Sequence, residues 1–488
     1  MPANRWITAR LATLAVVAAV TSTVLTAVVP APAASAQAST VARPDDDPFY
    51  AVPARLGSTR DGTVLRSRRL PADAMAVPAP AHVWQLLYKT RDNAGRATAT
   101  VGTLLVPTAP WAGDGARPLL SYQTPEDGLA TFCAPSYLLR AGSVPSGPTS
   151  VQFDREQVAA AVRRGWAVVV PDYEGPGSEF LGAMAAAHGV LDGVRAARSF
   201  APARVGRDAP VGLWGYSGGG FATAAAAQRQ AAYAPDLRIS GIAEGGVIAD
   251  LNASLRAVSG QVFSGWLPFG FAALRNAYPH ADVDRYLNPA ARAYADAVRH
   301  GCAGEAIAAG PFHAPLERFE AWPGSLTSGA FQDFAHRAGP IGLGGTPTAP
   351  VYLYHGTADE LIPIEGARRL AARYRAGGAD VVLVQDETWD HGGEQAHGVA
   401  GAVAFLDERF SAQHRGTGLP RRRPDQRGSS PAEDPALPGD TAGIAGSRLR
   451  SGRARRGPAR VRRLRAGRFR RPGPGRTGSP RPWRRRGA

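Results

Sequence analysis

The sequence predicts an α/β fold in which a mostly parallel sheet is covered by helices on both faces. Between about residues 45 and 412, short apolar runs alternate with helical patterns, as expected for repeated strand–helix units. Several of the apolar runs are hydrophobic at nearly every position, which is typical of parallel strands buried on both faces. The chain has 488 residues, of which 44% are hydrophobic. This is enough apolar material for a large core, so we expect one folded domain over residues 37–412.

Individual elements of this domain follow from the pattern. The predicted strands are residues 101–107, 118–123, 166–171, 211–214, 239–243, 351–354 and 381–385. The predicted helices are residues 155–164, 183–200, 219–230, 365–375 and 394–410. The polar stretch 90–96 predicts a hairpin or a loop. Residues 248–340 contain no convincing strand, but they do contain short Ala-rich helical pieces and Gly-Pro turns. We therefore expect a helical insertion there.

Residues 1–36 have the three parts of a secretory signal peptide. Arg5 and Arg10 form a basic start, residues 11–29 are apolar, and Ala34-Ser35-Ala36 offers a small-x-small cleavage site. The alternative is an uncleaved anchor helix, and both interpretations place the body of the protein outside the cytoplasm. No other apolar run reaches membrane-spanning length, so no transmembrane segment is expected after signal cleavage.

The net charge of +16 is concentrated at the C-terminus. Residues 415–488 contain 22 Arg, no Lys and 4 acidic residues, whereas residues 1–414 have a net charge of −2. The same 74 residues contain 13 Gly and 10 Pro, a composition that does not bury enough apolar surface to fold. We predict a disordered tail over residues 413–488, which is either an anion-binding arm or a solvated, even spurious, extension. Since the rest of the chain is nearly neutral, no obligate nucleic-acid partner is expected.

A serine motif lies between the strand predicted at 211–214 and the helix predicted at 219–230. Gly215-Tyr216-Ser217-Gly218-Gly219 matches G-x-S-x-G, and the strand–turn–helix context is the one in which this motif exposes a nucleophilic serine. The glycines permit a tight turn. The N–H of Gly218 lies at the helix N-terminus, where it faces a developing oxyanion. The alternative is a Gly-rich turn with a passive serine.

A serine hydroxyl needs a base to accept its proton, and on an α/β-hydrolase the chain order is Ser, acid, His. Asp359 directly follows the apolar run 351–354 and His355-Gly356-Thr357-Ala358, which places its carboxylate at the carboxyl edge of the sheet. The other candidates for the acid are Glu360, Asp386 and Asp390.

Three histidines follow these candidate acids. His391 lies between the strand predicted at 381–385 and the last predicted helix, on a loop from which its ring can reach the serine. His397 falls inside that helix, and His414 lies beyond it. We therefore favour His391 as the base and keep His397 as the alternative. His355 precedes the acid, so we expect a structural role for it.

The chain has two cysteines, Cys133 and Cys302. An oxidising compartment favours a disulfide between them, and the alternative is a pair of buried free thiols. No Cys/His cluster has the spacing of zinc ligands, so no metal site is predicted.

Several blocks of the sequence, taken together, resemble the secretory lipase family, which comprises extracellular α/β-hydrolases of the fungal lipase A type and their actinobacterial relatives. The resemblance covers about residues 47–411. The blocks are Asp47-Pro48-Phe49-Tyr50, residues 62–68, Ser121-Tyr122-Gln123 with Glu126-Asp127, residues 133–137, residues 165–175, the serine motif, residues 355–359 and residues 391–410.

The resemblance implies an α/β-hydrolase with a helical cap or lid insertion and a role for each motif residue. It makes Ser217 the nucleophile, Asp359 the acid and His391 the base. The resemblance also places one oxyanion-binding N–H at Asp127, beside the N–H of Gly218. Without the resemblance, Glu126-Asp127 would be interpreted as a solvated turn. Cys133 occupies the family's cysteine position, and pairing with Cys302 would join the core to the cap. The Arg-rich tail has no counterpart in the family pattern.

These observations lead to one expected function. We expect a secreted serine-dependent lipase that hydrolyses carboxylic esters, above all triacylglycerols, at a lipid–water interface and without a metal or organic cofactor. The alternatives on the same fold are a secreted carboxylesterase, an acyltransferase and a peptidase. A non-catalytic surface or nucleic-acid-binding protein is suggested by the tail alone.

Overall fold

The computed structural model describes residues 41–71, 73–143 and 150–414. The predicted signal peptide (1–36) and all but the first two residues of the predicted tail (413–488) lie outside these ranges. Residues 413 and 414 belong to the last helix, α14 (Val399–His414). No helix among the described residues is long and apolar enough to cross a membrane.

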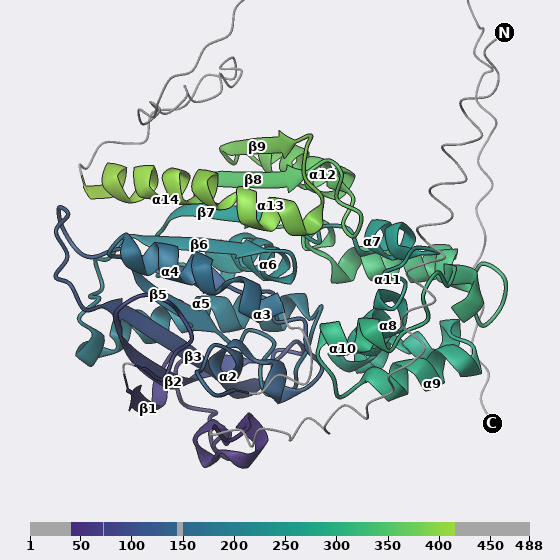
Figure 1. The fold of residues 1–488 in the computed structure, drawn as a ribbon, viewed down its shortest axis with the longest axis horizontal. Helices are drawn as coiled ribbons and strands as arrows, with labels where there is room; N and C mark the ends of the chain where they lie inside the picture. Colours follow the sequence, from purple (N-terminus) through teal and green to yellow (C-terminus); the bar gives the residue numbers. More distant parts are fainter. Residues whose placement is uncertain (1–40, 72, 144–149, 415–488) are drawn as a thin grey trace, which may run out of the picture. The chain divides into compact units, whose positions relative to one another are not determined.

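Nine strands of the described residues form one sheet, in the order β1-β2-β3-β5-β4-β6-β7-β8-β9 (Figure 1). The strands are β1 (Val64–Leu70), β2 (Ala81–Arg91), β3 (Ala97–Pro107), β4 (Leu119–Gln123), β5 (Ala167–Pro171), β6 (Val211–Tyr216), β7 (Ile239–Gly245), β8 (Val351–Gly356) and β9 (Val381–Asp386). The pairs β1–β2, β2–β3 and β3–β5 are antiparallel, and every neighbouring pair from β5 to β9 is parallel. The prediction of an α/β fold with a mostly parallel sheet is confirmed.

The seven predicted strands correspond to β3–β9, whereas β1 and β2 were not predicted. Strands are predicted from continuous apolar runs, and polar residues interrupt the apolar runs of β1 and β2. β1 is an edge strand with three arginines. In β2, buried Gln85 donates to the backbone oxygen of Ser136 at 2.7 Å, and buried Lys89 pairs with Asp61. Tertiary partners therefore compensate for burying the polar side chains of β2. Residues 92–96 form the turn of the β2–β3 hairpin.

Helices cover both faces of the sheet (Figure 1). The buried apolar side chains form two large clusters, one on each face of the sheet. Alternate residues of β5 point to different clusters: Ala167 and Val169 belong to the first, and Val168 and Val170 belong to the second. The first cluster includes α5 (Ala183–Ser199), α6 (Gly218–Tyr233) and α12 (Ile364–Ala376), and the second includes α4 (Arg155–Arg163) and α14. Short helices α2 (Pro135–Leu138) and α3 (Ser150–Phe153) lie before α4 in the chain.

The last predicted helix, 394–410, is two helices in the structure. α13 (His391–His397) begins three residues earlier than predicted, because the side chain of Asp390 accepts a hydrogen bond from the Gly393 N–H and caps it. Gly398 separates α13 from α14. A Cβ on Gly398 would lie 2.3 Å from a ring carbon of Tyr354, so only glycine permits this close approach to β8.

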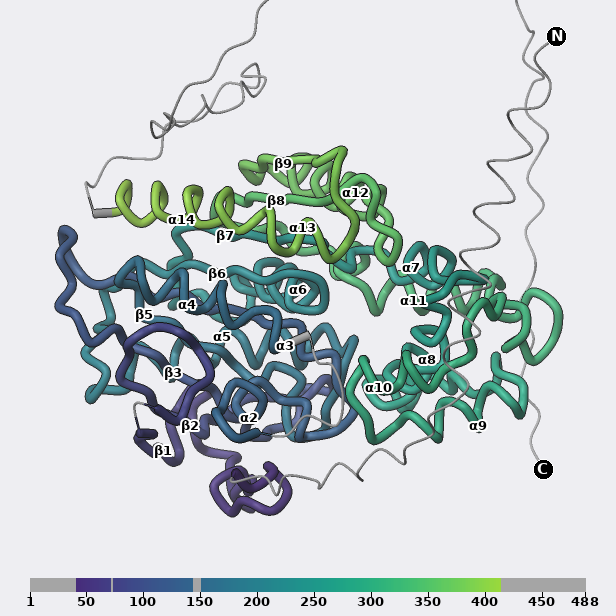
Figure 2. Tube along the Cα trace, viewed as in Figure 1, coloured from purple at the N-terminus to yellow at the C-terminus, as the bar shows by residue number. Residues whose placement is uncertain are grey.

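The chain between β7 and β8 forms helices and no strand. Its helices are α7 (Leu251–Val258), α8 (Trp266–Ala277), α9 (Pro289–Val298), α10 (Ala303–Ala308) and α11 (Gly329–Ala338). They gather beyond the carboxyl ends of the central strands (Figure 2). We call this segment, residues 246–350, the helical insertion.

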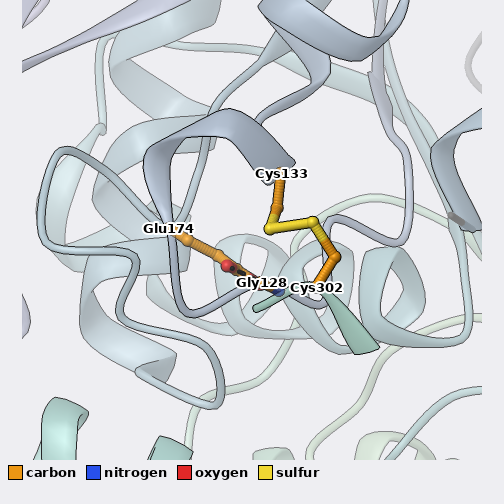
Figure 3. Close-up of a disulfide and its surroundings, with 4 residues drawn as sticks. All are labelled: Gly128, Cys133, Glu174 and Cys302. Atoms are coloured by element: carbon orange, nitrogen blue, oxygen red, sulfur yellow. Dashed lines mark hydrogen bonds between the residues drawn. A yellow bond between two sulfur atoms is a disulfide. The ribbon is translucent and has the colours of Figure 1, made fainter. Parts of the chain in front are cut away.

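A disulfide joins Cys133 to Cys302, with 5.5 Å between their Cα atoms (Figure 3). Cys133 follows the loop after β4, and Cys302 immediately precedes α10. The predicted pairing is thus confirmed, and it connects the sheet's β4 loop to the helical insertion.

Candidate active site

Ser217 occupies a sharp turn between β6 and α6. Its backbone has φ 56° and ψ −122°, a conformation that a non-glycine residue rarely adopts. A Cβ on Gly215 would lie 2.3 Å from the backbone oxygen of Gly219, and a Cβ on Gly219 would lie 1.9 Å from that of Gln123. Both glycines of the motif are therefore required by backbone packing, and the turn they permit presents the Ser217 hydroxyl beyond the end of β6.

His391 lies between Ser217 and Asp359. Its Nε2 is 2.9 Å from Ser217 Oγ, and its Nδ1 is 2.7 Å from Asp359 Oδ2. The other carboxylate oxygen of Asp359 accepts hydrogen bonds from the N–H groups of Leu361 (3.0 Å) and Ile362 (2.7 Å). Three residues separated by up to 174 positions thus form a hydrogen-bonded chain of the Ser-His-Asp type.

His391 is the first residue of α13 rather than a loop residue, and its backbone is held on both sides. Its N–H donates to Glu360 at 3.1 Å, and its carbonyl accepts a hydrogen bond from the Tyr216 hydroxyl at 2.7 Å. Sequence reasoning did not assign a role to Tyr216, although its position beside the serine of the motif was a signal that it lies in the site.

Of the other candidate residues, Glu360 contacts only the His391 backbone N–H, at 3.1 Å, and the rest lie farther from Ser217. The side chain of His397 is 58% exposed, lies 3.6 Å from Asp386 and contacts the ring of Trp389. Asp390 caps α13. His414 ends α14. The structure therefore brings His391, and not His397, to the serine.

Electrostatics favour an ion pair within this chain. Burial lowers the pKa of His391, but the negative charges of Asp359 and Glu360 reverse that effect and the net pKa is raised. Burial alone would raise the pKa of Asp359, yet the positive charge of His391 and the contacts of His391 and His355 hold it well below its usual range. Asp359 thus stays ionised beside His391 and stabilises a proton on it.

The loop after β4 carries the second group of candidate residues. Asp127 is 2% exposed and has a left-handed backbone with φ 43°. A Cβ on Gly218, the first residue of α6, would lie 1.9 Å from Asp127 Oδ1. The loop therefore packs directly against the N-terminus of α6, beside Ser217.

Backbone contacts tie this loop to the helical insertion. The Asp127 carbonyl accepts from the Ala303 N–H, and the Leu129 N–H donates to the Gly301 carbonyl, both at 3.0 Å. These bonds flank the disulfide at Cys302. A Cβ on Gly128 would lie 2.4 Å from Cys133 Cβ, so the loop leaves no room for a side chain there.

Glu174 supports the same loop from the sheet side. Its carboxylate accepts from the Gly128 N–H at 3.2 Å (Figure 3). Burial and the charges of Glu126 and Asp127 raise the pKa of Glu174 well above its usual range, and the hydrogen bond from the Gly128 N–H only partly offsets this. The pKa of Glu126 is raised in the same way, first by burial. The loop whose Asp127 N–H the resemblance assigns to an oxyanion is thus held by Glu174 through Gly128.

An apolar cavity opens beside the serine. Ser217 and His391 line one part of it, and the rest is formed by α7, α8 and three neighbouring loops. The apolar side chains that line it include Phe180, Leu251, Leu255, Trp266, Leu274 and Ile362. Such a lining suits a hydrocarbon chain attached to the group that reacts with Ser217. In the described part of the chain, no group of three or more His, Cys, Asp or Glu could hold a metal ion.

The sequence matches known proteins along most of this domain. A family model described as "Secretory lipase" matches residues 142–418. Lipase 2 of Candida albicans is 35% identical over 390 residues, covering 75% of this chain and 81% of that protein. A probable inactive lipase of Mycobacterium tuberculosis is 34% identical, covering 76% of this chain and 83% of that protein. The trichothecene C-3 esterase of Fusarium sporotrichioides is 31% identical, covering 77% of this chain and 87% of that protein.

The fold also matches a solved structure. Candida antarctica lipase A in its closed state has a TM-score of 0.68 and 24% identity, covering 76% of this chain and 87% of that chain. The match, together with the sheet order and the helical insertion, identifies the fold as an α/β-hydrolase.

Proposed function

We propose that this chain, which belongs to the secretory lipase family, is a secreted serine hydrolase that cleaves carboxylic esters with Ser217, His391 and Asp359. The resemblance found in the sequence is confirmed, and the lipase and esterase relatives support a carboxylic ester hydrolase. The observation that carries the finer assignment is the chain from Asp359 through His391 to Ser217, which borders an apolar cavity.

In the proposed reaction, Ser217 Oγ attacks the ester carbonyl and gives its proton to His391 Nε2, 2.9 Å away. Asp359 stabilises the resulting imidazolium through Nδ1. The tetrahedral intermediate expels the alcohol, which takes the proton from His391, and an acyl-enzyme remains on Ser217. Water then attacks the acyl carbon with His391 as the base, which releases the acid and restores the serine.

The negative oxygen of the intermediate needs hydrogen-bond donors. The N–H of Gly218, at the N-terminus of α6, is the first proposed donor, and the helix dipole reinforces it. The second is the Asp127 N–H, in the loop that Glu174 holds through its hydrogen bond with the Gly128 N–H. Each such donor lowers the barrier by about 2.7–4 kcal/mol in known hydrolases.

The apolar cavity supports a substrate with a hydrocarbon acyl chain. Each methylene moved from water into it stabilises the complex by about 0.8 kcal/mol, which favours medium or longer chains over acetate. Triacylglycerols are therefore the proposed substrates. One relative is named a trichothecene C-3 esterase. A carboxylesterase that acts on a non-lipid ester is therefore the second candidate function.

Secretion is proposed from the signal-like residues 1–36 and agrees with the disulfide, since such bonds persist in oxidising compartments. The mature protein would begin at about Gln37.

The decisive experiment is a chain-length series of p-nitrophenyl esters and triacylglycerols, with Ser217→Ala as the control. We expect kcat/KM to rise from acetate to medium or long chains and Ser217→Ala to abolish turnover. A fluorophosphonate should label wild type and not Ser217→Ala. Activity that persists in Ser217→Ala would overturn the proposed mechanism, and activity on acetate alone would overturn the proposed substrate class.

A further inference from the structure

A second histidine contacts the carboxylate of Asp359. His355 lies in β8 and is fully buried. Its Nε2 is 3.2 Å from Asp359 Oδ2, the same oxygen that His391 approaches at 2.7 Å, and 2.8 Å from the carbonyl oxygen of Ile362. The order along the chain predicts only a structural role for His355, because it precedes the acid, but these contacts place it on the acid itself.

The protonation state of His355 follows from its neighbours. The Ile362 carbonyl at 2.8 Å and the Asp359 carboxylate at 3.2 Å are both acceptors, so Nε2 must carry a proton, which it donates to Ile362 while facing Asp359. Within the described residues, Nδ1 is buried and has no hydrogen-bond partner. A second proton placed there would be buried without an acceptor, which is costly. Of the two ring nitrogens of His355, Nε2 is therefore the one that carries the proton.

We propose that His355 is a positioning residue, whose Nε2–H holds Oδ2 of Asp359 in line with Nδ1 of His391. The inference rests on the proposed function and deepens it. Leu361 and Ile362 donate hydrogen bonds to Oδ1 of Asp359, His391 lies 2.7 Å from Oδ2, and His355 Nε2 lies 3.2 Å from the same Oδ2. The carboxylate is thus restrained at both oxygens, and His355 restrains the one that touches the base.

Sharing Oδ2 also limits how strongly Asp359 attracts the proton of His391. The charged groups that act on His391 are Asp359, Glu360 and Asp127. Glu394 and Tyr216 are further titratable groups whose pKa values respond to Asp359. If the His355 N–H is removed, more of the carboxylate charge acts on the imidazolium, so the pKa of His391 should rise further. His391 acts as a base only when neutral, and the acid limb of the pH–rate profile should then move to higher pH.

The test compares His355→Phe with His355→Gln in the full chain. Gln places an amide N–H as many bonds from the backbone as Nε2 of His, whereas Phe fills the space without a donor. We expect His355→Phe to lower kcat about tenfold, to change KM less than about twofold and to shift the acid limb upward by about half a pH unit. His355→Gln should restore most of kcat and the wild-type limb. His397→Phe, at an exposed histidine, is the matched control.

Fluorophosphonate titration of Ser217 gives the concentration of folded active sites, so loss of folded protein is not counted as loss of kcat. An unchanged acid limb in His355→Phe, or equal activity of the Phe and Gln variants, would overturn the inference. A second measurement uses wild type: ¹⁵N spectra of labelled histidines, with His355 assigned from His355→Gln, should show the proton on Nε2. A proton on Nδ1 instead would also overturn it.

The two proposals fail differently. If wild type neither hydrolyses esters nor reacts with the fluorophosphonate, the proposed function falls and this inference falls with it. If wild type is active and His355→Phe matches it in kcat and pH profile, only the inference falls.

Discussion

Two halves of the candidate site meet at Ser217, and they are held in different ways. The acid–base half, formed by Asp359 and His391 after β8 and β9, is fixed by side-chain hydrogen bonds. The oxyanion half, formed by Asp127 after β4 and Gly218 at the start of α6, is fixed by backbone bonds and a disulfide to the helical insertion. Proton transfer should therefore depend on the sheet, and oxyanion binding should depend on the insertion.

The two halves also differ in charge. The acid–base half keeps Asp359 ionised through the charge of His391 and the contacts of both His391 and His355, although burial opposes this. In the oxyanion half, burial and neighbouring carboxylates raise the pKa values of Glu126 and Glu174. A negative charge stabilises the imidazolium, whereas a full charge behind the oxyanion loop would oppose the developing oxyanion.

The largest effect should come from breaking the acid–base half. His391→Ala removes the group that accepts the serine proton, so kcat should fall by at least about 10⁴-fold. His397→Ala is the matched control and should change kcat by less than about twofold. Steady-state hydrolysis of a p-nitrophenyl ester measures both. The reverse pattern would reassign the base to His397 and contradict the described geometry.

A smaller effect is expected from a steric change in the oxyanion half. Gly128→Ala places a Cβ at 2.4 Å from Cys133 Cβ, which costs about 1–3 kcal/mol if the loop shifts to relieve the clash. We expect kcat to fall about tenfold with little change in KM, because oxyanion binding acts in the transition state. The acid limb of the pH–rate profile, which reports His391, should stay in place.

Gly329→Ala is the control for this substitution, since a Cβ there meets nothing within 4 Å. A shifted acid limb in Gly128→Ala would show that the two halves are not separable as described.

A change in pH should act on stability through the oxyanion half. Because the folded protein keeps protons on Glu126 and Glu174 that the unfolded chain loses near its ordinary Glu pKa of 4.5, these groups stabilise the fold at low pH. This stabilisation is lost as the pH rises from that value through their folded-state pKa values. Glu174→Gln, which keeps an acceptor for the Gly128 N–H, should flatten the decline and raise Tm at pH 8 by about 2 °C or more.

Thermal unfolding of wild type and Glu174→Gln between pH 4.5 and 8 measures this decline. Glu365→Gln, on the exposed side of α12, should leave it unchanged. A steeper decline in Glu174→Gln would mean that Glu174 is ionised in the folded protein.

The smallest effect is expected from removing residues 415–488, which contribute neither half of the site. The deletion changes the net charge by −18. Because no residue of the described triad or cavity lies in the deleted segment, kcat on a soluble ester should change less than about twofold. Assays of the full and shortened chains at equal active-site concentration test this, and a large loss would assign the tail a role in catalysis.

Much of the fold was predictable because its signals are local. The apolar runs that became β3–β9 needed only their own residues to be recognised, and the strand–turn–helix context of Ser217 is contained in about twenty positions. β1 and β2 were missed because their polar residues are compensated by distant partners, as Lys89 is by Asp61. The helical insertion was recognised by the absence of strand patterns.

The sequence by itself determined the chain order of the proposed nucleophile, acid and base, the two glycines around Ser217 and the cysteine pair available to the disulfide. The tertiary structure decided which histidine reaches the serine, that Glu174 holds the Asp127 loop through the Gly128 N–H, and that His355 and His391 approach the same oxygen of Asp359. The physical reason is that such contacts depend on which loops meet at the carboxyl edge of the sheet. His391 and Ser217 lie 174 residues apart, and strand order and register, rather than any local pattern, bring their side chains within hydrogen-bonding distance.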